Sequence, residues 1–504
     1  MVEEVVAGQP VRCLVDRPGS VIEILDRALP GRAADLLLVD PARDQSVSYG
    51  QFADLVEGAA AALVALGLDA GDRVAVLARN GLEVAVAIWA CARAEAIFVG
   101  LPVDAPPARL QDLRALVGAR YVLAQPELAG RLTGPVHDAA AVLLGAPRPW
   151  QSCTSWPDQD ATYMLIPTSG TTGRPKAVRV TGRMTGHAAA FYAHALGLTP
   201  GDRTAIHLPF SWVSGHVTQL APAMHSGGSA VTMAGFSPAA LVSTVTEHDV
   251  TWLDVVPSIW EGLLRCDGFA LPGLAGVRLA VFGGAPAPSG TLEQVRDRLP
   301  QLELHDVYAL SETCAPVTHL SDAARGGGTV GRPVPYVELR VTDALGSALP
   351  PGQTGEVQVR SGVVTPGYWG DAPLALADGG WLRTGDLGSL DATGCLRTAG
   401  RVVDLIIRGG VNIYPQEVER ALLASGQLAE AVAFGVPSAV AGQNVAAAVV
   451  ALPGTEVDLT VLRRCVQDAL GAHAVPRPLR IVEALPRNAN GKVDRVMLVE
   501  QWSR

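Results

Sequence analysis

The chain has 504 residues, of which 49% are hydrophobic and 17% are charged, so it is long enough for two or three domains with sizeable cores. Its formal net charge is −10. Nucleic acids and anionic membranes attract basic surfaces, and this acidic balance argues against either as a partner.

The cysteines and the first residues of the chain indicate the cellular compartment in which the protein is expected. The seven cysteines are far apart and form no CxxC pair, which argues against a disulfide framework or a zinc site. The chain begins MVEEVV, with acids where a signal peptide carries bases, and its apolar stretches are broken well before membrane-spanning length. We therefore expect a soluble, cytoplasmic protein. Abundant Ala, Gly, Val and Arg with little Lys indicate a bacterial source.

Strand and helix patterns alternate in the first part of the chain. From Ser48, SYGQFADLVEGAAAALVALGL predicts a capped helix, and RVAVLA after it predicts a strand. LEVAVAIWACARAEA then predicts a helix, IFVGLPV a strand, Leu110 to Val117 a helix and YVLAQ a strand. This alternation predicts an α/β fold, with parallel sheets wrapped by helices on both faces.

The stretch TSGTTGRPK, from Thr168 to Lys176, has the composition of a phosphate-binding loop. Glycines let backbone N–H groups converge on one point, and hydroxyls and two cations add further donors. The apolar run YMLIP before it predicts a buried strand from which the loop hangs. Pro175 and Ala177 stand where a P-loop needs Gly and Ser or Thr, so this is a different phosphate loop. The alternative is a solvated Ser/Thr/Gly linker, which seldom lies between two β-prone runs.

At this loop the sequence resembles the adenylate-forming superfamily, which includes acyl- and aryl-CoA synthetases, luciferases and peptide-synthetase adenylation domains. The resemblance extends from about residue 35 to 497, with the motifs in family order. It implies a large N-terminal domain, residues 1–400, with a β-rich subdomain at about 330–400, which GEVQVRSG and GYW, from Gly355 to Trp369, resemble. It also implies a small, mobile α+β lid domain at 401–504, with a hinge at about 401–404.

After the phosphate loop the chain is expected to form a helix near His187 to Leu196, and the segment that follows, HLPFSWVSGHV from His207 to Val217, departs from the family pattern. Many relatives bring a His beside the substrate carboxylate at the position that Trp212 occupies here. Trp cannot take up a proton, so Trp212 is either a wall of an apolar pocket or plain core. A chemical role for His207 or His216 stays open. This segment has no Asp, which argues against an α-amino acid substrate.

Two further motifs resemble those that hold the nucleotide. In the family, GGAP runs beside adenine and the acyl pocket, where only small residues leave room for a flat ring. VYALSET resembles the aromatic-Gly-x-Thr-Glu motif, which makes Tyr308 the ring that stacks on adenine and Glu312 the magnesium ligand. Ala309 and Ser311 replace the usual Gly and Thr. Pro316 and Val317 resemble the pair that walls the ring pocket of aryl-CoA ligases.

The last motifs concern ribose, the thiol and the lid. By resemblance, Asp386 in GWLRTGDLG accepts both ribose hydroxyls, which suits a carboxylate with its pair of oxygens. Arg401 also reaches the ribose, and Lys492 in LPRNANGKVDR enters the active site for adenylation. The hinge residue is usually Asp or Lys, but Val403 stands there.

The predicted site therefore divides by role. The predicted catalytic residues are Lys492, Thr171 and Glu312, with Glu312 as metal ligand. The predicted ATP and AMP contacts are Thr168, Ser169, Gly170, Thr171, Thr172, Gly173, Lys176, Gly283, Gly284, Ala285, Pro286, Tyr308, Ala309, Ser311, Asp386 and Arg401. The predicted acid pocket comprises Trp212, Val213, Gly284, Pro316 and Val317, and the thiol tunnel Gly409 and Gly410.

The chemistry that needs these parts is carboxylate activation. A carboxylate attacks the α-phosphate of ATP, and Mg²⁺, the phosphate loop and Lys492 neutralise the charge that accumulates. The acid is already ionised, so positioning and electrostatics can carry the step without a general base. By resemblance, the lid then rotates and admits a thiol to attack the acyl-adenylate.

We expect an AMP-forming acid–thiol ligase that makes a CoA thioester from an aromatic or short hydrophobic acid, with a place in secondary metabolism. One alternative is a stand-alone enzyme that loads the phosphopantetheine of an acyl or peptidyl carrier protein. Another passes the adenylate to an amine or other non-thiol nucleophile, which Val403 and Trp212 motivate. A degenerate nucleotide-binding protein is disfavoured, because Lys492, Glu312, Asp386 and Arg401 are all present.

Overall fold

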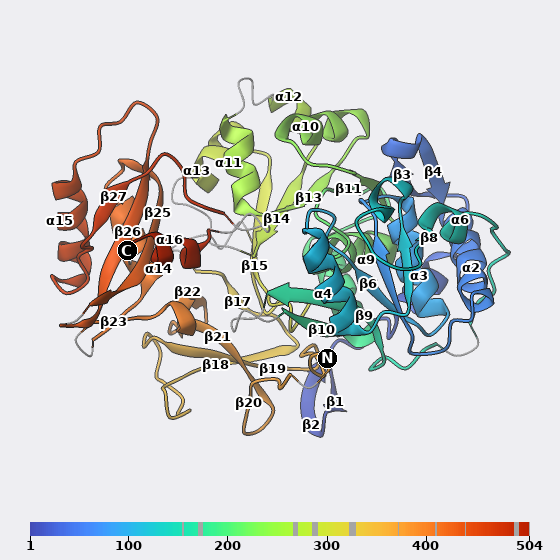
Figure 1. Ribbon diagram of the computed structural model, residues 1–504, viewed down its shortest axis with the longest axis horizontal. Coiled ribbons are helices and arrows are strands. Elements are labelled where there is room, and N and C mark those ends of the chain that lie inside the picture. Colours follow the sequence, from blue (N-terminus) through green and yellow to red (C-terminus); the bar gives the residue numbers. More distant parts are fainter. Residues whose placement is uncertain are drawn as a thin grey trace.

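The computed structural model describes residues 1–153, 156–169, 175–265, 271–284, 291–321, 329–370, 372–408, 411–438, 440–487 and 493–502. Two large sheets dominate the N-terminal part (Figure 1). The six-stranded sheet has the order β10 (Pro175–Thr181), β9 (Thr162–Ser169), β6 (Ile97–Gly100), β5 (Arg73–Leu77), β7 (Tyr121–Ala124) and β8 (His137–Asp138). Its strands are parallel except β10, which forms an antiparallel hairpin with β9.

The nine-stranded sheet is parallel in its middle and antiparallel at both edges. Its order is β17 (Arg332–Pro333), β16 (Thr318–Leu320), β15 (Glu303–Tyr308), β14 (Leu279–Gly283), β13 (Trp252–Val255), β11 (Arg203–Ile206), β12 (Ser229–Thr232), β3 (Leu36–Asp40) and β4 (Gln45–Ser48). The carboxyl ends of β11, β13, β14 and β15 therefore lie along one edge, which is where open parallel sheets bind ligands.

Helices cover both faces of both sheets, as the alternating pattern predicts. The central layer packs α1 (Val21–Ala28), α2 (Tyr49–Ala65), α3 (Leu82–Arg93), α6 (Ala139–Leu143), α7 (Gly182–Ala195) and α9 (Ala221–Ser226) into the largest apolar core. The outer face of the nine-stranded sheet carries α10 (Pro238–Glu247), α11 (Pro257–Arg265), α12 (Leu271–Leu274) and α13 (Thr291–Arg298). The outer face of the six-stranded sheet carries α4 (Pro107–Val117) and α5 (Pro126–Ala129).

Local capping explains where the helices begin. Ser48 caps α2 through a reciprocal capping box with Gln51, as the sequence predicts. The helix expected near His187 to Leu196 starts earlier, at Gly182, because the Thr181 side chain caps it. Glycine is needed there, since a Cβ on Gly182 would lie 2.2 Å from the carbonyl oxygen of Gly19.

Two smaller parts complete the chain. A five-stranded sheet contains β18 (Val337–Thr342), β19 (Gly355–Ser361), β20 (Leu376–Ala377), β21 (Trp381–Leu390) and β22 (Leu396–Arg401). The C-terminal part, orange to red in Figure 1, has β23 (Ile406–Arg408), β24 (Val411–Ile413), β25 (Leu428–Ser438), β26 (Gly442–Ala451) and β27 (Leu479–Ile481). Its helices α14 (Pro415–Leu423) and α15 (Leu459–Leu470) pack on one face of that sheet, and α16 (Arg495–Trp502) on the other.

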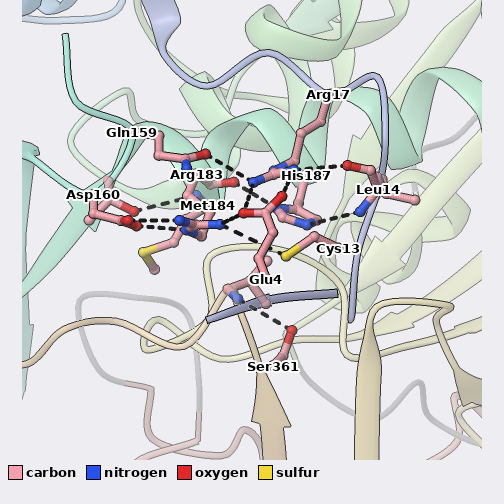
Figure 2. Close-up of polar contacts among 12 residues, drawn as sticks. Glu4, Cys13, Leu14, Arg17, Gln159, Asp160, Arg183, Met184, His187 and Ser361 are labelled. Atoms are coloured by element: carbon pink, nitrogen blue, oxygen red, sulfur yellow. Dashed lines mark hydrogen bonds and ion pairs between the residues drawn. The ribbon is translucent and has the colours of Figure 1, made fainter. Parts of the chain in front are cut away.

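The N-terminal hairpin of β1 (Val2–Val6) and β2 (Gln9–Cys13) is tied to the main body by buried ion pairs (Figure 2). The Glu4 carboxylate accepts from Arg17 at 2.8 Å and also pairs with Arg183 of α7. Arg183 in turn donates to Asp160 at 2.6 Å. Although burial raises the pKa of Glu4, its bonds to Arg17 and Arg183 outweigh that effect and lower the pKa to about 2.

The cysteines that the structure describes are all free, and no helix of the described chain is long and apolar enough to cross a membrane. Cys266 lies outside the described residues. The predicted division at residues 400 and 401 stays a prediction; β22 ends at Arg401, and the next strand, β23, belongs to a different sheet.

Candidate active site

Three of the predicted nucleotide-binding side chains contact one another. Asp386 on β21 and Arg401 on β22 are opposite each other in the antiparallel register. The Nε atom of Arg401 lies 3.1 Å from the Asp386 carboxylate. From the end of β15, Tyr308 donates its hydroxyl to the same carboxylate at 2.6 Å. The site thus joins two sheets through one acid.

The ionisation of Asp386 depends on its burial and on its two donors, Tyr308 and Arg401. Burial raises the pKa of Asp386, and the hydrogen bond from Tyr308 and the charge of Arg401 counteract this. Burial together with the negative Asp386 raises the pKa of Tyr308, so the phenol stays a donor. An acid held by two donors presents its remaining lone pairs in a fixed direction, as recognition of a vicinal diol requires.

The second group of contacts surrounds Glu312, which follows β15 on a short turn. The turn is fixed by the Thr313 hydroxyl, which accepts from the Leu310 N–H at 3.2 Å. Glu312 is half-buried, and its carboxylate accepts a 2.7 Å hydrogen bond from the Tyr368 hydroxyl. The Lys176 Nζ atom lies 4.6 Å from the centre of the Tyr368 ring. Tyr368 therefore links the phosphate-loop hairpin to the predicted metal ligand.

Tyr368 also corrects one sequence interpretation. By resemblance, the stretch from Gly355 to Trp369, which ends in GYW, is expected in the small β-rich subdomain. In the structure this segment runs along β10 of the six-stranded sheet instead. Tyr368 forms a β-bridge with Val178, and Trp369 donates its N–H to the Ala177 carbonyl at 2.8 Å. Only β19 of that stretch belongs to the β-rich sheet. The sequence does not reveal this, because pairing between distant strands leaves no local pattern.

The residues present fit a magnesium ion of the substrate-bridging kind. Mg²⁺ in nucleotide sites is typically held by one or two carboxylates and by substrate phosphates. Glu312 offers one carboxylate, and Tyr368, which donates to it, also packs against Lys176, the last residue of the phosphate loop. Within the described ranges, no group of three His, Cys, Asp or Glu side chains forms a dedicated metal cage.

The glycine pair at the end of β14 has a steric reason. A Cβ on Gly283 would lie 2.6 Å from the Val307 carbonyl oxygen of β15. Gly284 has a φ of +75° with open space around it, a conformation that side chains rarely adopt. The chain therefore leaves the sheet edge with bare backbone there. Ala285 and Pro286 lie outside the described residues.

The predicted acid-pocket residues other than Gly284 come from two segments of the chain. Trp212 and Val213 are half-buried at the start of α8 (Val213–Gly215), while Pro316 and Val317 are buried after the Glu312 turn. The Val317 N–H donates to the Tyr308 carbonyl at 2.8 Å, which places the pocket pair beside the nucleotide residues. Ala309 and Ser311 are half-buried between them.

The two histidines near Trp212 are held in the core. His216 is fully buried, 2.8 Å from the Tyr163 hydroxyl and edge-on to Trp89. Burial lowers the pKa of His216 to about 3 and that of His207 to about 4. Both rings are therefore neutral at neutral pH, and their contacts favour the packing role over a chemical one.

Several predicted residues cannot be placed. Outside the described residues lie Gly170, Thr171, Thr172 and Gly173 of the phosphate loop, together with Gly409, Gly410 and Lys492.

On the flanks of the loop, Thr168 is paired with Lys176 across the hairpin, and Ser169 with Pro175. At the hinge, Val403 is 65% exposed on the turn Val402–Asp404. Arg495 of the lid lies 4.0 Å from Asp404 on that turn.

Comparison with known proteins identifies the family. The family model for AMP-binding enzymes matches residues 26–369, and that for the AMP-binding enzyme C-terminal domain matches residues 417–492. The chain belongs to this family of AMP-binding, adenylate-forming enzymes, so the predicted resemblance is confirmed.

Individual relatives narrow the class. The chain is 32% identical to the sulfoacetate–CoA ligase of Cupriavidus necator, covering 92% of this chain and 94% of that one. It is 30% identical to the indoleacetate–CoA ligase of Aromatoleum aromaticum, with the same coverage of 92% and 94%. The crystal structure of ATP-bound MatB from Rhodopseudomonas palustris superposes with a TM-score of 0.87 at 26% identity, covering 96% and 99%. The predicted fold and the predicted class, an AMP-forming acid–CoA ligase, are confirmed.

Proposed function

We propose that this AMP-forming ligase converts an aromatic or short hydrophobic carboxylic acid into its CoA thioester through an acyl-adenylate. The observation that carries the proposal is the shared carboxylate of Asp386, which Tyr308 and Arg401 hold at 2.6 and 3.1 Å. This arrangement suits the ribose of a nucleotide, and Glu312, four residues after Tyr308, is linked through Tyr368 to Lys176 of the phosphate-loop hairpin.

The residues act by orientation and charge. Asp386 accepts the ribose hydroxyls, and the ring of Tyr308, fixed through its hydroxyl, offers a face to adenine. Lys176 and the loop before it neutralise phosphate charge, and Lys492 supplies a cation during adenylation. The substrate carboxylate attacks the α-phosphorus, a new P–O bond forms, and the bond to pyrophosphate breaks. No proton moves in this step.

Magnesium fits this scheme at Glu312, where it would stabilise negative charge on the phosphate oxygens. Tyr368 orients the Glu312 carboxylate by donating to it at 2.7 Å. In the second step the thiol attacks the acyl carbon, the acyl C–O bond breaks, and AMP leaves with the oxygen that came from the acid. The thiol proton leaves with solvent.

The preference for a compact apolar acid rests on Trp212, Pro316 and Val317. Trp212 is half-buried, Pro316 and Val317 are buried, and the Val317 N–H donates to the Tyr308 carbonyl. Trp212 in place of a His closes the pocket with a flat apolar wall rather than with a group that exchanges protons. A long acyl chain would need an open channel, so we expect fatty acids to be poorer substrates than aryl and short acids.

The test is pyrophosphate release with Mg²⁺–ATP across a panel of aryl, short aliphatic, fatty and amino acids. Each acid is assayed with CoA, with a phosphopantetheinylated carrier protein, with an amine, and without an acceptor. We expect release with aryl or short hydrophobic acids and a CoA thioester by mass spectrometry. Faster turnover with fatty acids refutes the pocket argument, and acylation of the carrier or the amine in preference to CoA refutes the proposed acceptor.

A further inference from the structure

A carboxyl group lies on the inner face of the nine-stranded sheet, where the mechanism above does not use one. Asp254 is the third residue of β13 and is only 9% exposed. Its neighbours Leu253 and Val255 point to the opposite face, into the core under α10 and α11. Side chains alternate along a strand, so Asp254 faces the central layer, toward α7 and the helical turns that follow Trp212.

The register gives the depth of this group below the strand ends. Asp254 lies opposite Val281 of β14 in the parallel pairing, and Val281 is buried in the central core. Gly283 is two residues further along β14, which is about 7 Å along a strand. Asp254 therefore lies roughly one para-substituted benzoate length below the glycine edge of the site.

The hydrogen bonding of Asp254 is incomplete. Its Oδ2 atom is bonded to the Thr218 hydroxyl, on the π-helical turn η2 (His216–Leu220). The same hydroxyl donates to the Ser214 carbonyl at 2.8 Å. A hydroxyl has one proton, so it cannot donate fully to both Ser214 and Asp254. In the described part of the chain, the Thr218 hydroxyl is the one side chain that is hydrogen-bonded to Asp254. A π-helical turn is itself a feature that recurs at functional sites.

The electrostatics agree with this geometry. Burial raises the pKa of Asp254 to about 7, and only the Thr218 hydrogen bond counteracts this. The charge of Asp254 also contributes to a raised pKa of Tyr192 on α7, so the phenol and the carboxyl lie on the same side. A carboxyl group buried in an apolar core with one side-chain hydrogen bond is costly to ionise. Such a cost is usual where a ligand supplies a further partner.

We propose that Asp254 is the residue that reads the far end of the acid, through Oδ1, and selects acids that carry a hydroxyl or amino group there. When it is ionised, or neutral with its proton on Oδ2 toward the Thr218 hydroxyl, the carboxyl presents Oδ1 as an acceptor, and the complementary substrate group is then a donor. The inference rests on the proposed function and deepens it. The acid is then apolar along its length, against Trp212 and Val317, and polar at the end opposite its carboxylate.

The experiment compares matched acids by pyrophosphate release. The pairs are para-hydroxybenzoate or para-aminobenzoate against para-methylbenzoate, and an ω-hydroxy short acid against its ω-methyl counterpart. For the wild-type chain we expect kcat/KM for the better donor acid to exceed that of its methyl partner by about tenfold or more, because a buried acceptor left unpaired rejects the analogue. Comparing para-hydroxybenzoate with para-aminobenzoate shows whether the preferred donor on the acid is a hydroxyl or an amino group.

Two variants separate selection from folding. Asp254→Leu should bring the ratio close to one or reverse it in favour of the methyl acid. Asp202→Asn is the matched control, because Asp202 is a buried acid at the amino end of the neighbouring strand β11, held by Arg278 at 2.8 Å. It should lower thermal stability but leave the ratio unchanged.

The outcomes differ for the two proposals. A wild-type ratio near or below one, or a ratio that Asp254→Leu leaves unchanged, overturns the role of Asp254 while the ligase activity stands. If no acid of either kind releases pyrophosphate, the proposed function fails and the selection by Asp254 fails with it.

Discussion

Tyr368 connects the phosphate-loop hairpin to the predicted metal ligand, and replacing it by Phe tests that connection. Tyr368→Phe removes the 2.7 Å hydrogen bond to Glu312 but keeps the ring beside Lys176. A hydrogen bond to a charged group contributes about 1.5–3 kcal/mol. Because both side chains are half-buried, we take the lower end, about 1.5 kcal/mol, which corresponds to roughly tenfold in rate.

The expected result is a roughly tenfold lower kcat/KM for Mg²⁺–ATP, with a higher Mg²⁺ concentration needed for half-maximal pyrophosphate release. Tyr368→Leu should lose more, because the cation–π contact with Lys176 adds about 0.5–1 kcal/mol. Tyr121→Phe is the matched control, since Tyr121 lies on β7 of the six-stranded sheet and the change removes its 2.5 Å hydrogen bond to the Gly67 carbonyl. An unchanged Mg²⁺ dependence in Tyr368→Phe, with only thermal stability lowered, would refute the reasoning.

Three further predictions concern the lid, the hinge and the N-terminal hairpin. Lys492→Ala should abolish adenylation, measured as ATP–pyrophosphate exchange, but should leave thioester formation from a supplied acyl-adenylate within about an order of magnitude. Val403→Asp should alter the thiol step alone, and equal rates of both steps in variant and wild type would show that Val403 does not limit the lid. Glu4 has its pKa lowered to about 2 from 4.5, so its ion pairs stabilise the fold fully above pH 4.5 and lose that effect as the pH falls toward 2. Glu4→Gln should therefore unfold more easily than the wild type at neutral pH by about 3 kcal/mol, and the difference should vanish near pH 2; denaturant midpoints at a series of pH values measure it.

Much of the fold could be predicted from local sequence patterns. The Ser48 capping box, the helix after it and the alternation through Tyr121 depend on near neighbours in the chain, which sequence displays directly. The start of α7 was misplaced because its buried first turn packs against Gly19 and Ser20, residues distant in sequence. The loop between β9 and β10 was expected between two β-prone runs, and the hairpin has that form.

Site contacts were less accessible to sequence. Tyr308 and Asp386 are 78 positions apart, and no local pattern shows that they touch. Tyr368 was read as part of a neighbouring subdomain, because its pairing with Val178 is long-range. Asp254 went unremarked within an apolar strand, since only the register with β14 and the contact with Thr218 show which face it occupies. The predicted roles of Asp386, Arg401 and Glu312 stay predictions until variants are assayed.

The measurement that tests the central claim most directly follows oxygen from the acid. The preferred acid is labelled in its carboxylate with the heavy oxygen isotope and incubated with Mg²⁺–ATP and CoA, and AMP is examined by mass spectrometry. Attack of the carboxylate on the α-phosphorus, followed by thiol attack on the acyl carbon, predicts AMP that carries one labelled oxygen. Unlabelled AMP, or ADP as the nucleotide product, would contradict activation through an acyl-adenylate.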